Sequence, residues 1–204
     1  ELLRALSERY PGLEPELVVS TSEELERAVA ERRLDLAFVS NPTGDPRLDI
    51  VPLGVQDAAW AAPPGWGLPD ALRPSDLRTL PVLSTPHPSP MHRQILGWFH
   101  TAGLEPPRLG LCSSVTVIAH LVASGAAASF LPRKMIEAEI ARGRIEVFAA
   151  RPEVERSRVA AVYPAAERGP ATGAVLRCAL DVLAAIDFLL PLPDGVPVAQ
   201  EAAG

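Results

Sequence analysis

The chain has 204 residues, of which 48% are hydrophobic and 22% are charged, and its formal net charge is −6 at pH 7. This composition excludes a disordered chain and predicts a globular protein, either one domain or two small lobes. Because the chain is acidic and has no dense stripe of Lys and Arg, it lacks the basic surface that nucleic-acid binding requires. If the whole protein works on DNA, another domain must supply that surface.

The sequence also argues against a membrane segment, a secretion signal and a metal site. No apolar run reaches the roughly 18 residues that a membrane-spanning helix needs, and residues 1–4 show no basic region leading into an apolar one. Cys112 and Cys178 are far apart, which is typical of a reduced cytoplasmic pair, and no CxxC or HExxH spacing occurs. We therefore expect a cytoplasmic protein with no membrane partner, no metal and no cofactor.

The first part of the chain predicts short helices and strands. Apolar residues at helical spacing over residues 2–10 predict a helix that ends at Pro11 and Gly12. Residues 16–19 predict a strand, and the helix that follows begins with Thr21 and Glu24 at the spacing of a capping box. Further strands are expected over residues 34–39, 48–51 and 58–61.

After a proline-rich stretch over residues 63–74, strands alternate with helices. Strands are expected at residues 81–83, 109–112, 127–131, 145–148 and 159–163. Helices are expected at residues 93–102, after 114, from Pro132 in its first position to Gly143, and at 171–189. This alternation is typical of α/β layers with mostly parallel sheets.

Small hydroxyl residues follow three of the expected strands. In open α/β sheets ligands lie beyond the carboxyl ends of strands, and helix N-termini offer free N–H groups to anions. A cleft rich in hydroxyls and poor in Arg and Lys would suit a small carboxylate. Since Ser and Thr are also common N-caps, capping alone is the alternative interpretation at each position. The residues are Ser20, Thr21, Ser84, Thr85, Ser113 and Ser114.

Several segments, in this order and spacing, resemble the effector-binding domain of LysR-type transcriptional regulators. They are Arg9-Tyr10-Pro11-Gly12-Leu13, Thr21-Ser22-Glu23-Glu24-Leu25 followed by Leu34-Asp35-Leu36-Ala37-Phe38, then Pro52-Leu53, and Leu121-Val122-Ala123-Ser124-Gly125 through Phe130-Leu131-Pro132. The resemblance covers the chain from Glu1 to about Leu189. One departure is Ala127, which stands where the family has a second glycine.

The resemblance implies an α/β, two-lobed periplasmic-binding-protein type II fold, in which each lobe is a mixed, mostly parallel sheet flanked by helices. Residues 1–61 and 158–204 would form lobe I, and residues 62–157 would form lobe II. The family also carries a strand before the first helix and an N-terminal winged helix-turn-helix DNA-binding domain. Neither is expected within this chain.

The function that the resemblance implies is effector sensing. A small molecule would bind between the lobes and alter the geometry of a homodimer or homotetramer, with DNA bound only through the missing N-terminal domain. The six hydroxyl residues would line the cleft, and Val115 and Phe130 would form an apolar wall, although core packing is the stronger interpretation for both. Helices starting at Ser22 and Ser114 are expected at a dimer interface, and Glu26, Arg27 and His120 lie on their opposite, solvated faces.

Other functions stay open. A solute-binding protein for transport would share the fold but would need a secretion signal. An enzyme is not expected, because no Gly-x-Ser-x-Gly elbow, phosphate loop, dinucleotide-binding glycine pattern or paired carboxylates stand out. A redox switch through Cys112 is a minor alternative, because a thiol near a helix N-terminus can be acidified, but Cys178 offers no evident partner.

Overall fold

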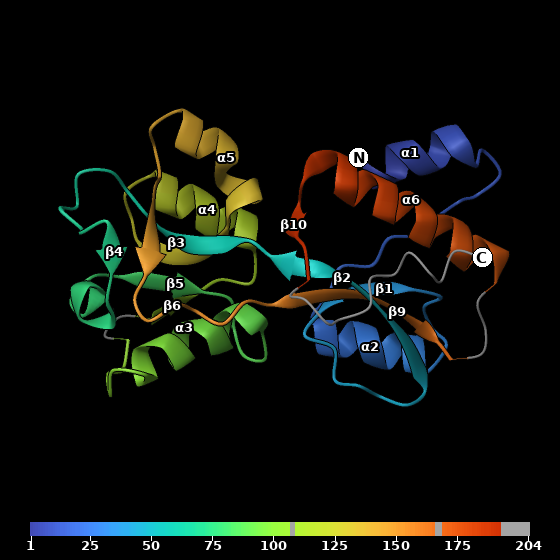
Figure 1. The fold of residues 1–204 in the computed structure, drawn as a ribbon, viewed down its shortest axis with the longest axis horizontal. Helices are drawn as coiled ribbons and strands as arrows, with labels where there is room; N and C mark the ends of the chain where they lie inside the picture. The colour runs from blue at the N-terminus through green and yellow to red at the C-terminus, as the bar shows by residue number, and fades with distance from the viewer. Residues whose placement is uncertain (107–108, 166–168, 193–204) are drawn as a thin grey trace. The chain divides into compact units, whose positions relative to one another are not determined.

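The computed structural model describes residues 1–106, 109–165 and 169–192, and the chain divides into two compact units (Figure 1). Unit 1 comprises Glu1–Gln56 and the chain from Ser157 onward, and unit 2 comprises Asp57–Arg156. Each unit holds helices packed on one sheet, so the α/β class is confirmed. Residues 193–204, which the sequence assigns to lobe I, lie outside the described residues.

Unit 1 has a four-stranded sheet in which all described strand pairs are antiparallel. The expectation of mostly parallel strands is therefore wrong here. The reason is the path of β9, which returns from unit 2 and inserts between the two strands that precede it in the chain. The strand order is β1 (Ala37–Ser40), β9 (Arg158–Pro164), β2 (Leu48–Gln56) and β10 (Leu189–Leu190).

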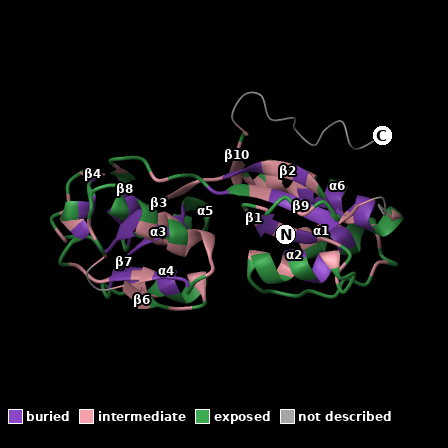
Figure 2. Ribbon diagram, turned by 90° about the horizontal axis from the view of Figure 1, so that it is seen from below, coloured by how far each residue is buried: buried purple, intermediate pink, exposed green. Residues whose placement is uncertain are grey.

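Helices cover both faces of the unit 1 sheet (Figure 1). Helix α2 (Ser22–Ala30) packs on one face, where Val29 is buried with Ala37, Val39 and Val162. Helix α6 (Pro170–Ile186) packs on the other face, and α1 (Leu2–Arg9) lies beside α6. The central strand β9 is therefore buried over most of its length (Figure 2).

Unit 2 has a six-stranded mixed sheet. Strand β5 is parallel to β6 and β7, and β3 is antiparallel to β7 and β8. The order is β4 (Ala71–Leu72), β8 (Glu146–Ala150), β3 (Ala58–Ala62), β7 (Ala128–Pro132), β5 (Val82–Ser84) and β6 (Leu109–Leu111). A 3₁₀ turn, η1 (Pro74–Leu77), follows β4.

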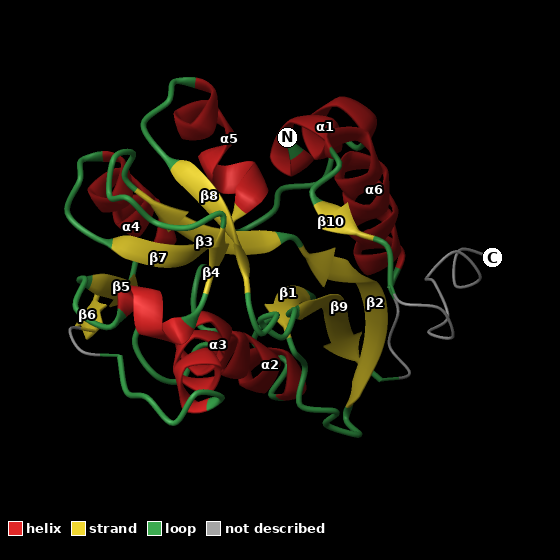
Figure 3. Cartoon of the chain, turned by 60° about the vertical axis from the view of Figure 1, so that its left-hand side comes forward, coloured by secondary structure: helices red, strands yellow, loops and turns green. Residues whose placement is uncertain are grey.

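Helices cover both faces of this sheet (Figure 3), and a separate hydrophobic core lies on each face. On one face α3 (Pro90–His100) contributes Trp98 and Phe99 to an aromatic cluster with Trp60 and Phe130. On the other face α4 (Val115–Ala123) and α5 (Arg133–Ala141) pack through aliphatic side chains. These two layers fix the strand ends at which the candidate site lies.

Most predicted elements form where the sequence places them, with three exceptions. The helix predicted to run to residue 189 ends at Ile186, because Asp187 takes the left-handed conformation and Leu189 begins β10. No strand forms at residues 16–19, where Leu17 is 67% and Val19 is 88% exposed. A strand needs a hydrogen-bonded neighbour, and the described residues provide none for this segment. Pro132 is the N-cap of α5, not its first residue, because it still pairs with Ala58 as the last residue of β7.

Candidate functional site

Two of the three predicted hydroxyl pairs lie side by side at one edge of the unit 2 sheet. Parallel strands β5 and β6 are in register, with Ser84 opposite Leu111, and the Cys112 N–H donates to the Ser84 carbonyl oxygen at 2.9 Å. Both strands therefore end at the same edge. Ser84 and Thr85 leave one strand there, and Ser113 leaves the other.

The end of β5 forms a hydrogen-bonded cluster with the start of α3. The Ser84 hydroxyl is fully buried, donates to the Thr85 carbonyl oxygen at 2.9 Å and lies 3.4 Å from Nδ1 of His92. The Thr85 hydroxyl is 2.6 Å from that of Ser89, the N-cap of α3. Ser84 is thus held within the protein. Thr85 is 9% exposed, and its hydroxyl meets that of the half-buried Ser89 at a helix N-terminus, where anions are favoured.

The end of β6 presents hydroxyls at the N-terminus of α4. Ser114 is the N-cap, and its hydroxyl oxygen accepts a hydrogen bond from the Val117 N–H at 3.3 Å. Ser113 is exposed, and the half-buried Val115 packs against the aliphatic core. Capping therefore accounts for Ser114, and the exposed Ser113 has its hydroxyl at the start of the helix.

Ser20 and Thr21 lie in unit 1, where both support the start of α2. Thr21 is the N-cap and accepts from the Glu24 N–H at 3.3 Å, which is one half of the predicted capping box. The Ser20 hydroxyl donates to the Glu24 carboxylate. This hydroxyl, followed by the Thr21 N–H, lowers the pKa of Glu24 below its ordinary value. Capping accounts for both hydroxyls in this structure.

Phe130 is a core residue. It is 5% exposed and makes an edge contact with Trp60, with ring centroids 5.9 Å apart. Its position favours the packing interpretation that the sequence also gave for it.

Glu26 corrects the expectation of a solvated helix face. It is 5% exposed, and one of its carboxylate oxygens accepts from the Thr43 N–H at 3.0 Å and from the Thr43 hydroxyl at 2.6 Å. This carboxylate holds the loop after β1 against α2. Arg27, which is exposed and 3.3 Å from Glu23, and His120, which is exposed, match the expected solvated face.

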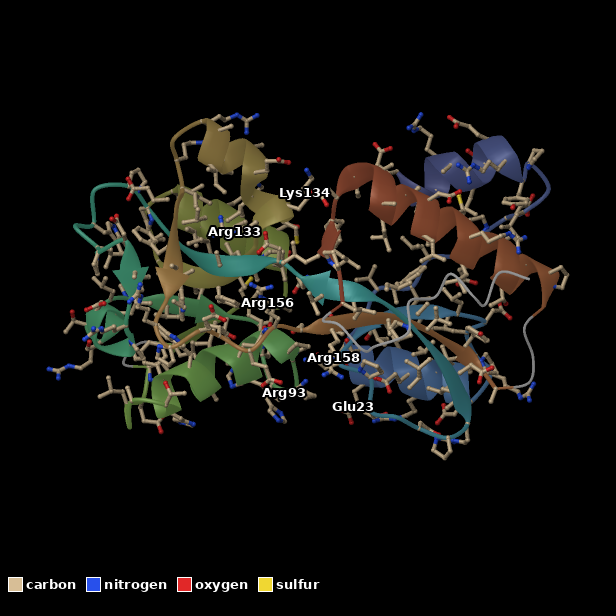
Figure 4. The ribbon with its side chains drawn as sticks, in the orientation of Figure 1. Glu23, Arg93, Arg133, Lys134, Arg156 and Arg158 are labelled. Carbon is tan, nitrogen blue, oxygen red and sulfur yellow. The ribbon has the colours of Figure 1, made fainter. Side chains whose placement is uncertain are left out.

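The same edge of unit 2 carries basic side chains that the sequence prediction missed (Figure 4). Arg133 follows β7, and its N–H donates to the Asp57 carbonyl oxygen at 2.9 Å where β3 begins. Arg93 lies on α3. The side-chain amide of the next residue, Gln94, donates to the Glu155 carbonyl oxygen at 2.6 Å, so Arg156 follows directly after this contact. All three arginines are exposed. The only sequence signal was that Arg133 begins a helix directly after a strand.

The described residues contain neither a candidate metal site nor a candidate membrane-spanning helix. Within residues 1–106, 109–165 and 169–192, no three His, Cys, Asp or Glu side chains are grouped so as to hold a metal ion. None of the helices in those ranges has both the length and the apolar character needed to cross a membrane.

Comparison with known proteins identifies the family. Residues 1–184 match the family described as LysR substrate binding domain. A probable hydrogen peroxide-inducible genes activator of Mycobacterium avium is 25% identical over 147 residues, which are 71% of this chain but only 47% of that protein. The chain thus spans about half the length of this relative.

Two solved structures show the same fold. The BenM effector binding domain with its effector benzoate has a TM-score of 0.73 and 19% identity, covering 96% of this chain and 90% of that one. The effector binding domain of QuiR in complex with shikimate has a TM-score of 0.70 and 16% identity, covering 89% and 88%. They confirm the type II periplasmic-binding-protein fold. With residues 1–184 matched, the chain belongs to the LysR substrate binding domain family.

Proposed function

We propose that the chain is the effector-sensing part of a LysR-type transcriptional regulator and that its effector is a small carboxylate. The observation that carries this proposal is the shared sheet edge of unit 2, where Thr85, Ser89 and Ser113 place hydroxyls at the N-termini of α3 and α4. Helix N-termini and hydroxyl donors favour a carboxylate, because its oxygens accept several hydrogen bonds at once.

Charge supports the same ligand class. Arg93, Arg133 and Arg156 add positive charge along this edge, which attracts an anion as it approaches, and Asp57, whose carboxylate is 3.7 Å from the Arg133 guanidinium, offsets part of it. Benzoate and shikimate, bound by the two structural relatives, each carry one carboxylate. The other site residues that the sequence predicts stay a prediction, and most of them also have a capping or packing role: Ser20, Thr21, Ser84, Ser114, Val115 and Phe130.

The rest of the proposal concerns what effector binding does. Binding would shift the geometry of a homodimer or homotetramer, and DNA would be contacted by a separate domain of the cytoplasmic regulator. No catalysis is required of such a domain. The transport alternative is not favoured, because the family match is to the regulatory domain. A strictly monomeric sedimentation profile at high protein concentration would contradict the oligomer.

A thermal-shift screen tests the ligand class. The panel pairs carboxylates with neutral analogues of the same shape, such as benzoate with benzamide and shikimate with its methyl ester. Stabilisation should follow the carboxylate, and Thr85→Val or Ser113→Ala should reduce it. Ser124→Ala, which removes an exposed hydroxyl at the C-terminal end of α4, is the matched control. Stabilisation by neutral or cationic compounds alone would overturn the proposal.

A further inference from the structure

Unit 2 contains an open cavity of about 380 Å³ beside β4, the end strand of its sheet. This volume is within the range of small-molecule sites, about 300–1,000 Å³. The cavity is at the C-terminal end of α3, whereas Ser89 and the site proposed above are at its start, and a helix of 11 residues spans on the order of 16 Å. Its lining residues are Arg73, Pro74, Ser75, Ala102, Arg151 and Pro152.

Two neighbouring strands lead into this cavity, and each is followed directly by an Arg-Pro pair. Strands β4 and β8 are parallel and in register, with Leu72 opposite Ala150, so the next residues, Arg73 and Arg151, come side by side. The Arg151 N–H donates to the Leu72 carbonyl oxygen at 2.7 Å, which fixes this alignment. Both arginines therefore line the cavity from the carboxyl ends of parallel strands, where α/β proteins bind ligands.

The two guanidinium groups carry positive charge that no described carboxylate pairs with. Within residues 1–106, 109–165 and 169–192, neither Arg73 nor Arg151 forms an ion pair. The Asp76 carboxylate accepts from the Arg73 backbone N–H at 2.7 Å, and the exposed Glu153 offsets part of the charge from a distance. Like charges at opposite positions of neighbouring strands repel each other. An anion bound between the two arginines would remove this repulsion.

The backbone around the cavity is held in place, and the nearby helix end does not oppose an anion strongly. The Trp98 indole N–H donates to the Pro152 carbonyl oxygen at 2.7 Å, which ties the segment after β8 to α3. The carbonyl oxygens of Trp98, Phe99 and His100 accept hydrogen bonds from residues 101–104. Because these carbonyls are already paired, the negative end of the α3 dipole is partly neutralised.

The two arginines select the kind of anion. A guanidinium group donates two parallel hydrogen bonds to an oxyanion, and a carboxylate has only two oxygens, which one guanidinium can occupy. A phosphate monoester has three terminal oxygens and a charge of about −1.5 to −2 at pH 7, so it can serve both guanidinium groups and match their charge. The exposed Ser75 hydroxyl, which also lines the cavity, adds a third donor.

We propose that this cavity binds a phosphoryl group, either inorganic phosphate or the phosphate of a small monoester, with Arg73 and Arg151 as its main ligands. Each guanidinium donates to terminal oxygens, and the Ser75 hydroxyl donates to a further one. Pro74 and Pro152 contact the organic part of a monoester. The site does not depend on the carboxylate site proposed above, because the two share no residue.

Isothermal titration calorimetry of the whole chain in phosphate-free buffer tests this assignment. The probes are inorganic phosphate and phenyl phosphate. The control ligand is methyl phenyl phosphate, which keeps the ring but has one charge and two terminal oxygens. Both probes should bind saturably, and the diester should bind at least about tenfold more weakly than phenyl phosphate. Tighter binding of phenyl phosphate than of inorganic phosphate would identify a monoester as the ligand, and equal binding would identify free phosphate.

Three arginine variants locate the site. Arg73→Gln and Arg151→Gln should each weaken phenyl phosphate binding at least about tenfold, because each removes a bidentate donor. Arg78→Gln is the matched control, since it removes the same charge from an exposed residue at the end of η1 that does not line the cavity. It should change the affinity less than about twofold, as expected for an exposed charge screened by salt.

NMR amide shifts supply the second measurement. Phenyl phosphate should shift the amides of Arg73, Ser75 and Ala102. Equal binding of the diester, or equal weakening by Arg78→Gln and Arg151→Gln, would overturn the proposal. Shifts confined to Thr85 and Ser89 would also overturn it, because they would place the phosphate in the carboxylate site.

Discussion

The carboxylate of Glu26 should be a main anchor of the loop after β1, and its removal should destabilise unit 1. Glu26 is 5% exposed. One of its carboxylate oxygens accepts two hydrogen bonds from Thr43, from the N–H at 3.0 Å and from the hydroxyl at 2.6 Å. Hydrogen bonds to charged groups contribute about 1.5–3 kcal/mol each, but burial of the charge offsets part of this. Thr43 is exposed, so water replaces the lost partner. We therefore expect Glu26→Ala to lower the free energy of unfolding by about 2 kcal/mol.

Urea denaturation measures this change, and a double-mutant cycle assigns it to the loop. Thr43→Val removes only the hydroxyl and should cost about 1 kcal/mol. If the two groups interact, the combined variant should be less destabilised than the sum by about 1 kcal/mol. Glu23→Ala is the control on the same helix, because its exposed pair with Arg27 should contribute less than about 1 kcal/mol. A Glu26→Ala variant as stable as Glu23→Ala would refute the reasoning.

Three further predictions follow from packing, backbone and charge. Phe99→Ala empties a fully buried aromatic position and should cost about 3–5 kcal/mol in urea denaturation. Gly54→Ala should cost about 1–3 kcal/mol, because its φ is +155° and a β10 carbonyl oxygen lies 2.7 Å from an added Cβ, whereas Gly97→Ala meets open space and should not destabilise. The Arg47 guanidinium hydrogen-bonds Asp45 and lowers the pKa of that carboxyl to about 2. Because this pKa lies below the unfolded value, the stabilisation holds above about pH 4 and is lost as the pH falls towards 2. NMR titration of Arg47→Gln should return the pKa towards its ordinary value.

Local patterns were sufficient to predict most elements of the fold. The predicted capping box of Thr21 and Glu24 depends on residues three apart, and the Thr21 cap and its helix form as predicted. The strand predicted at residues 16–19 does not form, because it depends on contacts that are not local. Its apolar, β-branched composition favours a strand, but strand formation depends on a pairing partner that composition does not encode.

The candidate site was predictable only in part, because its parts meet through tertiary contacts. The ends of β5 and β6 could be matched from the strand pattern, and the structure brings Ser84 and Cys112 together. The sequence could not show that β7 would place Arg133 at the same edge, since that depends on strand order. Nor could it show that Glu26 would turn inward, because its partner Thr43 lies in a loop 17 residues away.

The central claim is that carboxylate effectors bind at the hydroxyl edge of unit 2, and NMR amide shift perturbation tests it most directly. Carboxylates that stabilise the protein are titrated into the labelled chain, beginning with benzoate and shikimate. We predict that the largest shifts cluster at Thr85, Ser89 and Ser113 and that Thr85→Val weakens the response. Shifts confined to other parts of the chain, with those three amides unchanged at saturation, would contradict the account.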